Sequence, residues 1–367
     1  MHYYRNEKED IIMNYLENML KIIGNTPLLK LNKIGKDVPA NIFVKLEYLN
    51  PSGSYKDRMA LSMIEAAEKG LTWNNKKLGL GGVVVDASAG NTAPALAFIC
   101  AVKGYKAKLF IYKPMLQGPG VRLKITGAFG ADINESPHPS SFLSNEELAQ
   151  CLEDNHDLTY IMAGKMHAYE LEKNDPNVIW VDQIYNKYNY LGQMSIGYEL
   201  YKQLGGAIDA FGCAVGSGAT LLGSILGLAE NNIHPLTFGV VPHGSEVYME
   251  LQKNESKKGE FKKSNMMEKL IHAMGLKKWE TEKSIIDEML DRGYPDEFFR
   301  VTTEEARYMA NRLCKEEGIY CGMSSGANVF VALKIAKRLK KGQNVVTVIV
   351  DRRDRYLGEY PKDVFIV

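Results

Sequence analysis

Short runs of apolar, mostly β-branched residues recur along the chain, and this pattern constrains the fold more than any other feature. Stretches with the apolar period of a helix lie between these runs, for example at residues 95–102 and 306–317. Continuous apolar strands separated by helices are typical of a parallel sheet that is buried on both faces. The sequence therefore predicts an α/β protein with mainly parallel sheets. The six clearest runs are residues 42–44, 83–85, 109–111, 178–181, 238–241 and 345–350.

Length and composition narrow the class of protein. The 367 residues, 45% of them hydrophobic, suffice for two closely packed domains or one large one. A formal net charge of +1 argues against a protein that binds nucleic acid by electrostatics. No apolar run reaches bilayer length, and the polar, partly acidic N-terminus is unlike a secretory signal. We therefore expect neither a nucleic acid nor a membrane as a partner.

Five cysteines are scattered along the chain without a C-x-x-C pair, and the seven histidines show no spacing typical of a metal site. We therefore expect no metal. Four of the cysteines have apolar neighbours, which predicts buried free thiols and a reducing, cytoplasmic location. Two capping boxes, at residues 144–147 and 302–305, predict two helix starts.

Lys56 follows a turn-forming Pro51-Ser52-Gly53 segment and precedes an amphipathic run at residues 59–64. An ammonium group at the start of a helix is poorly matched to the helix dipole, so we expect its pKa to be lowered. The neutral amine is the form that attacks a carbonyl, as in a Schiff base with an aldehyde cofactor. A single lysine among 45 Lys and Arg residues is ordinarily a solvated charge, so this interpretation depends on other motifs.

Three glycine-containing loops follow strands and precede helices, at residues 86–92, 216–220 and 322–327. The first offers hydrogen-bonding side chains for an anion, and the second offers helix N-terminal amides that suit a phosphate. The second loop lacks the lysine of a P-loop and is not G-x-G-x-x-G, so ATP and NAD fit poorly. Each loop alone is an ordinary connection between a strand and a helix of an α/β protein. Together with Lys56 they fit one cofactor, pyridoxal 5′-phosphate (PLP).

Two longer motifs carry a family resemblance. Residues 23–28 read IGNTPL, and residues 45–58 read KLEYLNPSGSYKDR, which is similar to a KLE-NP-GS-KDR signature. With the three loops and Arg355-Tyr356-Leu357, the chain resembles the cysteine synthase and cystathionine β-synthase family over about residues 20–360. These are fold type II PLP enzymes related to the tryptophan synthase β subunit.

The resemblance implies two three-layer α/β/α domains with mainly parallel sheets. Residues 1–55 and 177–367 would form a large PLP-binding domain that includes the N-terminal segment. Residues 56–176 would form a smaller, mobile domain that carries the carboxylate loop. Within it, residues 134–176 carry only one short helical signal and are predicted to be an insertion.

The resemblance also implies a role for individual residues. Lys56 would hold PLP and then act as the acid and base at Cα. Asn91 would bind the O3′ atom of the cofactor, and Ser324 would face the pyridine nitrogen. The phosphate would be bound by Gly216, Ser217, Gly218, Ala219 and Thr220. The substrate carboxylate would be bound by Ser88, Ala89, Asn91 and Thr92, with Gln183 nearby.

The predicted function is PLP-dependent β-replacement on an L-serine- or L-cysteine-type amino acid through an aminoacrylate intermediate. The leading case is cysteine synthase-like, with an O-activated serine and sulfide or a thiol, and the resemblance implies a homodimer. One alternative is a β-eliminating lyase or dehydratase, which Ser88-Ala89 in place of Thr-Ser favours slightly. Others are a nitrogen nucleophile, giving 2,3-diaminopropionate, and a non-catalytic binding protein, against which the intact Lys56 argues.

Several further residues have weaker predictions. His272 lies in the segment at residues 272–279 that takes the place of the family's glycine-rich closing segment. Tyr185 follows Gln183 closely and is a candidate to border the substrate. Arg352 and Arg353 are interpreted as solvated charges.

Overall fold

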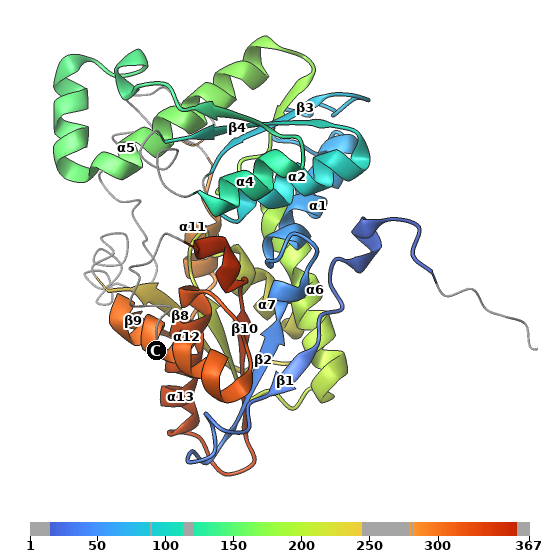
Figure 1. Ribbon diagram of the computed structural model, residues 1–367, viewed down its shortest axis with the longest axis vertical. Coiled ribbons are helices and arrows are strands. Elements are labelled where there is room, and N and C mark those ends of the chain that lie inside the picture. The colour runs from blue at the N-terminus through green and yellow to red at the C-terminus, as the bar shows by residue number, and fades with distance from the viewer. Residues whose placement is uncertain (1–14, 89, 113–119, 244–278, 280–281, 358–367) are drawn as a thin grey trace, which may run out of the picture.

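The computed structural model describes residues 15–88, 90–112, 120–243, 279 and 282–357. These residues form two sheets (Figure 1). The strand order is β1-β2-β10-β7-β8-β9 in the large sheet and β5-β4-β3-β6 in the small one. The large sheet comprises β1 (Leu28–Lys30), β2 (Asn41–Leu46), β7 (Ala210–Ala214), β8 (Leu236–Pro242), β9 (Glu297–Val301) and β10 (Asn344–Ile349). The small sheet comprises β3 (Val83–Ala87), β4 (Lys106–Ile111), β5 (Asp132–Glu135) and β6 (Val178–Trp180).

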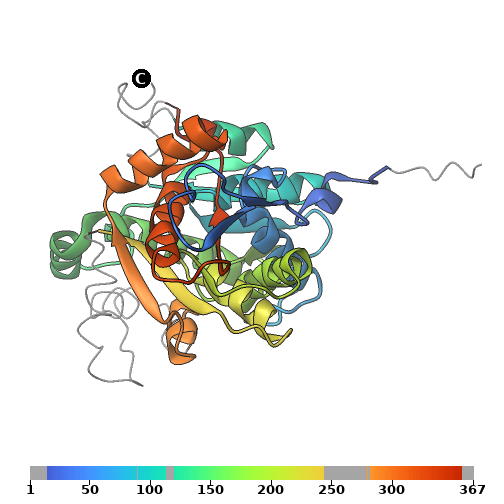
Figure 2. The same ribbon diagram turned by 90° about the horizontal axis from the view of Figure 1, so that it is seen from below.

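Helices cover both faces of each sheet. Figure 1 shows the small sheet above the large one, with α5 (Asn145–Asn174) on its outer side. The other side carries α1 (Lys56–Glu68), α2 (Thr92–Lys103) and α4 (Val121–Ala128). On the large sheet, α6 (Lys187–Leu204), α7 (Ala219–Ala229) and α11 (Ile285–Asp291) lie opposite α12 (Thr303–Glu317) and α13 (Met323–Ala336), as the view from below also shows (Figure 2).

The strands of the large sheet are buried on both faces. In β10, Val345 and Ile349 pack against α12 and α13, whereas Val346 and Val348 pack in the core beneath α6 and α7. Every strand pair is parallel except β1 with β2, which is antiparallel. The predicted α/β class with mainly parallel sheets is therefore confirmed.

All six apolar runs form strands, but β7 contains no such run and was implied only by the glycine loop that follows it. This strand reads Ala-Phe-Gly-Cys-Ala and has no β-branched residue. Its Gly212 packs so closely on β8 that a β-carbon there would lie 2.1 Å from the Phe238 carbonyl oxygen. The missing β-branched signal is thus a consequence of close strand packing.

The helix α5 corrects the predicted helical content of residues 134–176, while their being an insertion stays a prediction. It is a continuous helix of 30 residues that begins with the predicted Ser144–Glu147 capping box. The polar side chains of Lys165 and Glu172 occupy buried positions on this helix and hide its apolar period. The strand β6 then joins the small sheet just beyond residue 176, and the domain boundaries stay a prediction.

A buried network of charges joins α1 to α6. Arg58 pairs with Glu47 at 2.7 Å and with Glu199 at 2.6 Å, and Glu199 also pairs with Lys45 at 2.6 Å. The Thr26 hydroxyl donates to Glu47 at 2.6 Å. Burial raises the pKa of Glu199, but the hydrogen bonds and charge of Arg58, helped by Lys45, lower it to about 2. We call these five residues the closed network; they belong to the two sequence motifs, except Glu199.

Among the described residues, none of the helices combines the length and apolar character needed to cross a membrane.

Candidate active site

Lys56 is the first residue of α1. A β-bridge between Ser54 and Asp351 brings this helix start beside the end of β10. Burial lowers the pKa of Lys56 to about 8; the charge of Asp86 opposes this effect, and that of Lys165 adds to it. The predicted direction of the shift is confirmed, although burial rather than the helix dipole is its main cause.

The loop of residues 216–220 connects β7 to α7. Gly218 has φ of 81° in the left-handed region, a conformation that glycine adopts without strain, and it is the N-cap of α7. The amides at the start of a helix have no intrahelical partner and suit a phosphate. Thr220 is hydrogen-bonded to the partly buried side chain of Tyr55, the residue before Lys56, so the phosphate loop lies close to the lysine.

The carboxylate loop connects β3 to α2. Its Gly90 amide donates to Ser88 Oγ at 3.2 Å, and Thr92 Oγ1 donates to Gln183 Oε1 at 2.6 Å. The structure thus brings Thr92 and Gln183 together, while Ala89 lies outside the described residues. Asn189, for which no role was predicted, donates to the Gln183 carbonyl at 2.6 Å and lies 3.5 Å from Ser217 Oγ. This asparagine links Ser217 of the phosphate loop to Gln183, the hydrogen-bond partner of Thr92.

Asn91 connects the two sheets. Its Nδ2 donates to Asp351 Oδ2 at 2.5 Å, and its Oδ1 accepts a hydrogen bond from Arg355 at 2.6 Å. Asp351 is fully buried in the turn that follows β10, and Tyr356 donates to the same carboxylate. The two contacts fix the orientation of the Asn91 amide. The sequence did not predict the contact of Asn91 with either of these residues.

Ser324 is the second residue of α13 and is half-buried. The start of α13 lies close to Asp351, since a β-carbon at Gly322 would be 2.3 Å from Asp351 Oδ1. Arg353 corrects a prediction: it is buried and donates to the Cys321 carbonyl at 3.0 Å and to Asn311 Oδ1 at 2.9 Å. Only Arg352 is exposed, as predicted.

A cavity of about 340 Å³ lies at the carboxyl ends of all four strands of the small sheet. Ligands of open α/β sheets bind at this edge. We call this cavity the strand-end cavity. Ser88 and Gly90 of the carboxylate loop line it, together with Ala87, Phe110, Tyr112, Arg122, Ser136, Ile161, Lys165, Gln183 and Ile184.

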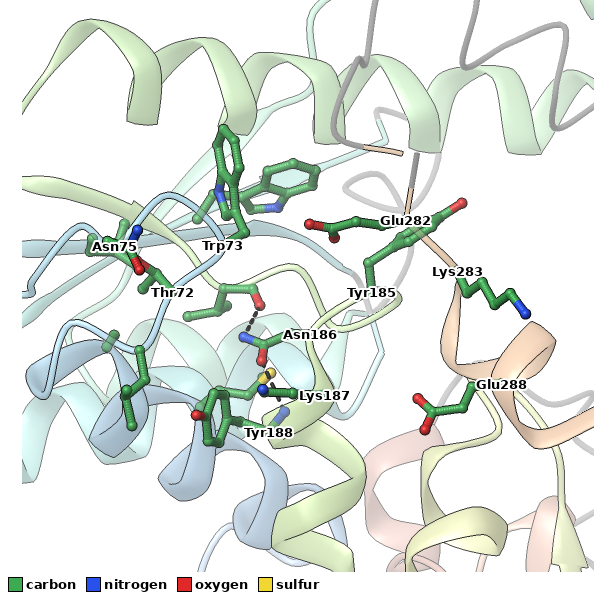
Figure 3. Close-up of a pocket in the computed structure, with 16 residues that line it drawn as sticks. Thr72, Trp73, Asn75, Tyr185, Asn186, Lys187, Tyr188, Glu282, Lys283 and Glu288 are labelled. Atoms are coloured by element: carbon green, nitrogen blue, oxygen red, sulfur yellow. Dashed lines mark hydrogen bonds between the residues drawn. The ribbon is translucent and has the colours of Figure 1, made fainter. Parts of the chain in front are cut away.

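A second cavity, of about 430 Å³, is lined by aromatic residues (Figure 3). Trp73 lies on one side of it, and Tyr185 and Glu282 lie on the other. Tyr185 is buried and stacks on Trp279 with ring centroids 4.5 Å apart. Tyr185 therefore lines this cavity and is absent from the lining of the strand-end cavity. His272 and residues 272–278 lie outside the described residues.

The amine and the loops fit PLP by their own chemistry. Lys56 supplies an amine with a lowered pKa, and the start of α7 supplies amides for a phosphate. A β-carbon built on Gly216 meets nothing within 4 Å, so the phosphate loop borders open space. The two sheets present these groups at the carboxyl ends of β3, β7 and β10.

Comparisons with known proteins agree with this geometry. Residues 19–351 match the protein family described as "Pyridoxal-phosphate dependent enzyme". The chain belongs to this family. Its members use pyridoxal phosphate, and this PLP enzyme is 33% identical to cysteine synthase 1 of Emericella nidulans over 348 residues, which is 93% of this chain and 84% of that protein.

Three further proteins extend the comparison. The PLP enzyme is 30% identical to cystathionine beta-synthase of Dictyostelium discoideum over 353 residues, which cover 96% of this chain and 63% of the relative. A hydrogen sulfide-producing enzyme from Fusobacterium nucleatum superposes with a TM-score of 0.67 at 29% identity, covering 93% of this chain and 100% of that one. An O-acetylserine dependent cystathionine beta-synthase from Helicobacter pylori superposes with a TM-score of 0.70 at 26% identity, covering 94% and 98%.

Proposed function

We propose that this enzyme catalyses cysteine synthase-like β-replacement on an L-serine- or L-cysteine-type amino acid, with sulfide or a thiol as the nucleophile. The observation that carries the proposal is the half-buried Lys56, whose pKa is lowered to about 8 by desolvation, beside a phosphate loop and a carboxylate loop. The names of its relatives support the same chemistry, since they include cysteine synthases and cystathionine beta-synthases.

The residues around the substrate have different roles in the proposed reaction. PLP, when bound, withdraws electrons from the α-carbon of the attached amino acid. Lys56 Nζ, which is partly neutral near pH 8, takes the α-proton and later returns it. Thr92 and the neighbouring loop amides orient the substrate carboxylate, with Gln183 fixing the threonine hydroxyl.

The cofactor would be held by residues on the other side of the site. Asn91, whose amide is oriented by Asp351 and Arg355, would bind the O3′ atom in this proposal. Ser324 at the start of α13 faces the pyridine nitrogen in this proposal. The amides of Gly216, Ser217, Gly218, Ala219 and Thr220 bind the phosphate.

The test is the Lys56→Ala variant compared with Lys69→Ala, which changes an exposed lysine just beyond the same helix. Purified protein is mixed with O-acetyl-L-serine, O-phospho-L-serine, L-serine or L-cysteine, with sulfide and without it. We expect the wild type and Lys69→Ala to form an amino-acid product and Lys56→Ala to form none while remaining folded. Substantial turnover by Lys56→Ala would exclude the proposal.

The same assay separates the second candidate, β-elimination. The hydrogen sulfide-producing neighbour and the Ser88 start of the carboxylate loop favour it. Pyruvate and ammonia in place of a new amino acid identify elimination. Formation of 2,3-diaminopropionate with an amine or ammonia would identify a nitrogen nucleophile instead.

We also propose a homodimer in the cytoplasm. The side chains of Tyr15, Leu16, Met19 and Ile22 are exposed on the segment around η1 (Met19–Ile22), at the edge of the molecule beside α2 (Figure 1). Burying them against a second copy accounts for their exposure. The five free cysteines suit a reducing compartment. Sedimentation analysis of the purified protein gives the oligomeric state.

A further inference from the structure

Lys165 and Asp86 form a buried ion pair at the strand-end cavity. Lys165 comes from the middle of α5, and its Nζ lies 3.2 Å from Asp86 Oδ1. Both side chains are almost completely buried, and Lys165 is part of the cavity lining. Burying a charge is costly unless its hydrogen-bonding groups have partners. Any donor of Lys165 that lacks a partner therefore needs an explanation.

This ion pair is incomplete on both sides. An ammonium group has three N–H donors, and among the described residues Asp86 Oδ1 is the one acceptor of Lys165. The same oxygen also accepts from Trp180 Nε1 at 3.2 Å and from the Ala87 amide at 2.8 Å. The other oxygen, Asp86 Oδ2, is buried without a hydrogen-bond partner. Lys165 therefore has donors left for a ligand in the cavity.

A glycine allows Lys165 to reach this place. A β-carbon on Gly164 would lie 2.6 Å from Ser136 Oγ and 3.0 Å from Ala87 Cβ. Only a residue without a side chain lets α5 approach the ends of β3 and β5 so closely. The backbone is thus built to bring the following lysine to the carboxyl edge of the small sheet.

The lining of the cavity favours an anion. Lys165 and Arg122 are its charged groups, and the lining contains no carboxylate among the described residues. Hydroxyl groups of Ser88, Ser136 and Tyr112 add hydrogen-bond donors. Because Ser88 and Gly90 also belong to the carboxylate loop, the cavity is continuous with the place where we propose that the substrate carboxylate binds.

We propose that the strand-end cavity is a subsite for a negatively charged group on the β-substituent of the amino-acid donor, and that Lys165 binds this group. This inference rests on the proposed function and narrows it. The enzyme prefers donors with an anionic β-substituent, such as a phosphate ester, over neutral ones such as an acetyl ester. Arg122, which comes from α4, lines the same cavity and strengthens the field that the anion meets.

The first experiment measures binding without turnover. L-2-Amino-3-phosphonopropionate carries the anionic group on a carbon–phosphorus bond, and L-alanine lacks the group altogether. Both are titrated into the holoenzyme while the absorption of its cofactor is recorded. For Lys165→Met we expect the Kd of the phosphonate to rise about tenfold or more, the effect of losing one charge-assisted hydrogen bond, and that of L-alanine to change less than about threefold.

Three variants separate ligand binding from a structural role. Lys173→Met, which changes an exposed lysine on the same helix, is expected to bind both ligands like the wild type. Asp86→Asn removes the charge that neutralises Lys165, so the phosphonate is expected to bind as tightly as before or more tightly. The double variant Asp86→Asn/Lys165→Met leaves no unpaired buried charge and is expected to fold but to bind the phosphonate weakly.

The outcomes separate the two proposals. Wild-type phosphonate affinity in the folded double variant, or equal losses in Asp86→Asn and Lys165→Met, would overturn the subsite. A wild type that turns over O-acetyl-L-serine at least as well as O-phospho-L-serine, with Lys165→Met indifferent between them, leaves the proposed function intact and overturns the inference. If the holoenzyme reacts with no donor and does not bind L-alanine, both proposals fail.

Discussion

Two of the buried charge clusters among the described residues differ in one respect. In the closed network, Lys45, Glu47, Arg58 and Glu199 each have a partner of opposite charge. In the pair of Asp86 and Lys165, one carboxylate oxygen has no hydrogen-bond partner and the ammonium borders a cavity. A saturated cluster fixes the structure around it, whereas an unsaturated one retains the capacity to bind a ligand.

Both clusters affect Lys56, but by different routes. Arg58 stands two residues after the lysine and anchors the first turn of α1 to α6. Asp86 and Lys165 act on its pKa through their charges, in opposite directions. The first cluster therefore sets the position of the amine, and the second adjusts its protonation.

The strongest test of this comparison removes a charge from the closed network. Arg58→Met leaves Glu47 fully buried without its partner, and we expect a loss of about 3–5 kcal/mol in the free energy of unfolding. Urea unfolding followed by circular dichroism gives the value. Arg312→Met, which breaks a surface pair with Glu316, is the control and should change stability by less than about 1 kcal/mol. Equal effects of the two variants would contradict the structural role of the network.

The pH dependence of stability sharpens the comparison further. The pKa of Glu199 is lowered from its ordinary value of 4.5 to about 2, so its stabilising contribution is complete above about pH 4.5 and is lost as the pH falls towards 2. The stability difference between wild type and Glu199→Gln should therefore be on the order of 2–3 kcal/mol at pH 7 and shrink across this interval. Unfolding curves from pH 7 to 3 measure it. A difference that is constant with pH would argue against a charged Glu199 in the network.

A smaller effect is expected at the glycine that brings α5 to the strand ends. Gly164→Ala puts a methyl group 2.6 Å from Ser136 Oγ, and overpacking of this kind costs about 1–3 kcal/mol. Thermal unfolding measures the loss. The control is Gly127→Ala in α4, where the nearest atom to the new β-carbon is 3.8 Å away and no loss is expected. If both variants have the stability of the wild type, α5 is not packed as described.

The smallest effect on stability is expected from replacing the open pair. In Asp86→Asn/Lys165→Met both charges disappear together, and replacing a buried pair in this way changes stability by less than about 1.5 kcal/mol, or raises it. Urea unfolding of the apoprotein is the measurement. A loss as large as that of Arg58→Met would show that this pair, too, mainly holds the fold together.

The sequence was sufficient where the signal was local. The β-branched runs marked six strands, and the capping boxes at Ser144 and Thr302 marked two helix starts. The motifs also predicted that Lys56 opens a helix and that glycine loops follow β3 and β7.

The sequence did not predict those features of the site that depend on contacts between residues far apart in the chain. Asn91 meets Asp351 across 260 residues, and no local pattern records such a pairing. Lys165 lies in the middle of α5 and belongs to no sequence motif. It reaches the strand-end cavity because Gly164 lets α5 approach the strand ends closely. The predicted site residues themselves remain a proposal until the variants are measured.

The three tryptophans of this chain all lie around the small sheet, at Trp73, Trp180 and Trp279. The ring of Trp180 lies 5.5 Å from that of Trp279, and its Nε1 donates to Asp86. Tryptophan emission therefore reports on one half of the molecule, and in particular on the surroundings of the Asp86 carboxylate. In our proposal the cofactor lies between the two sheets, where Lys56 of α1 meets the loops that follow β3 and β7. Two optical signals, recorded on one unlabelled sample, can thus follow the small sheet and the active site.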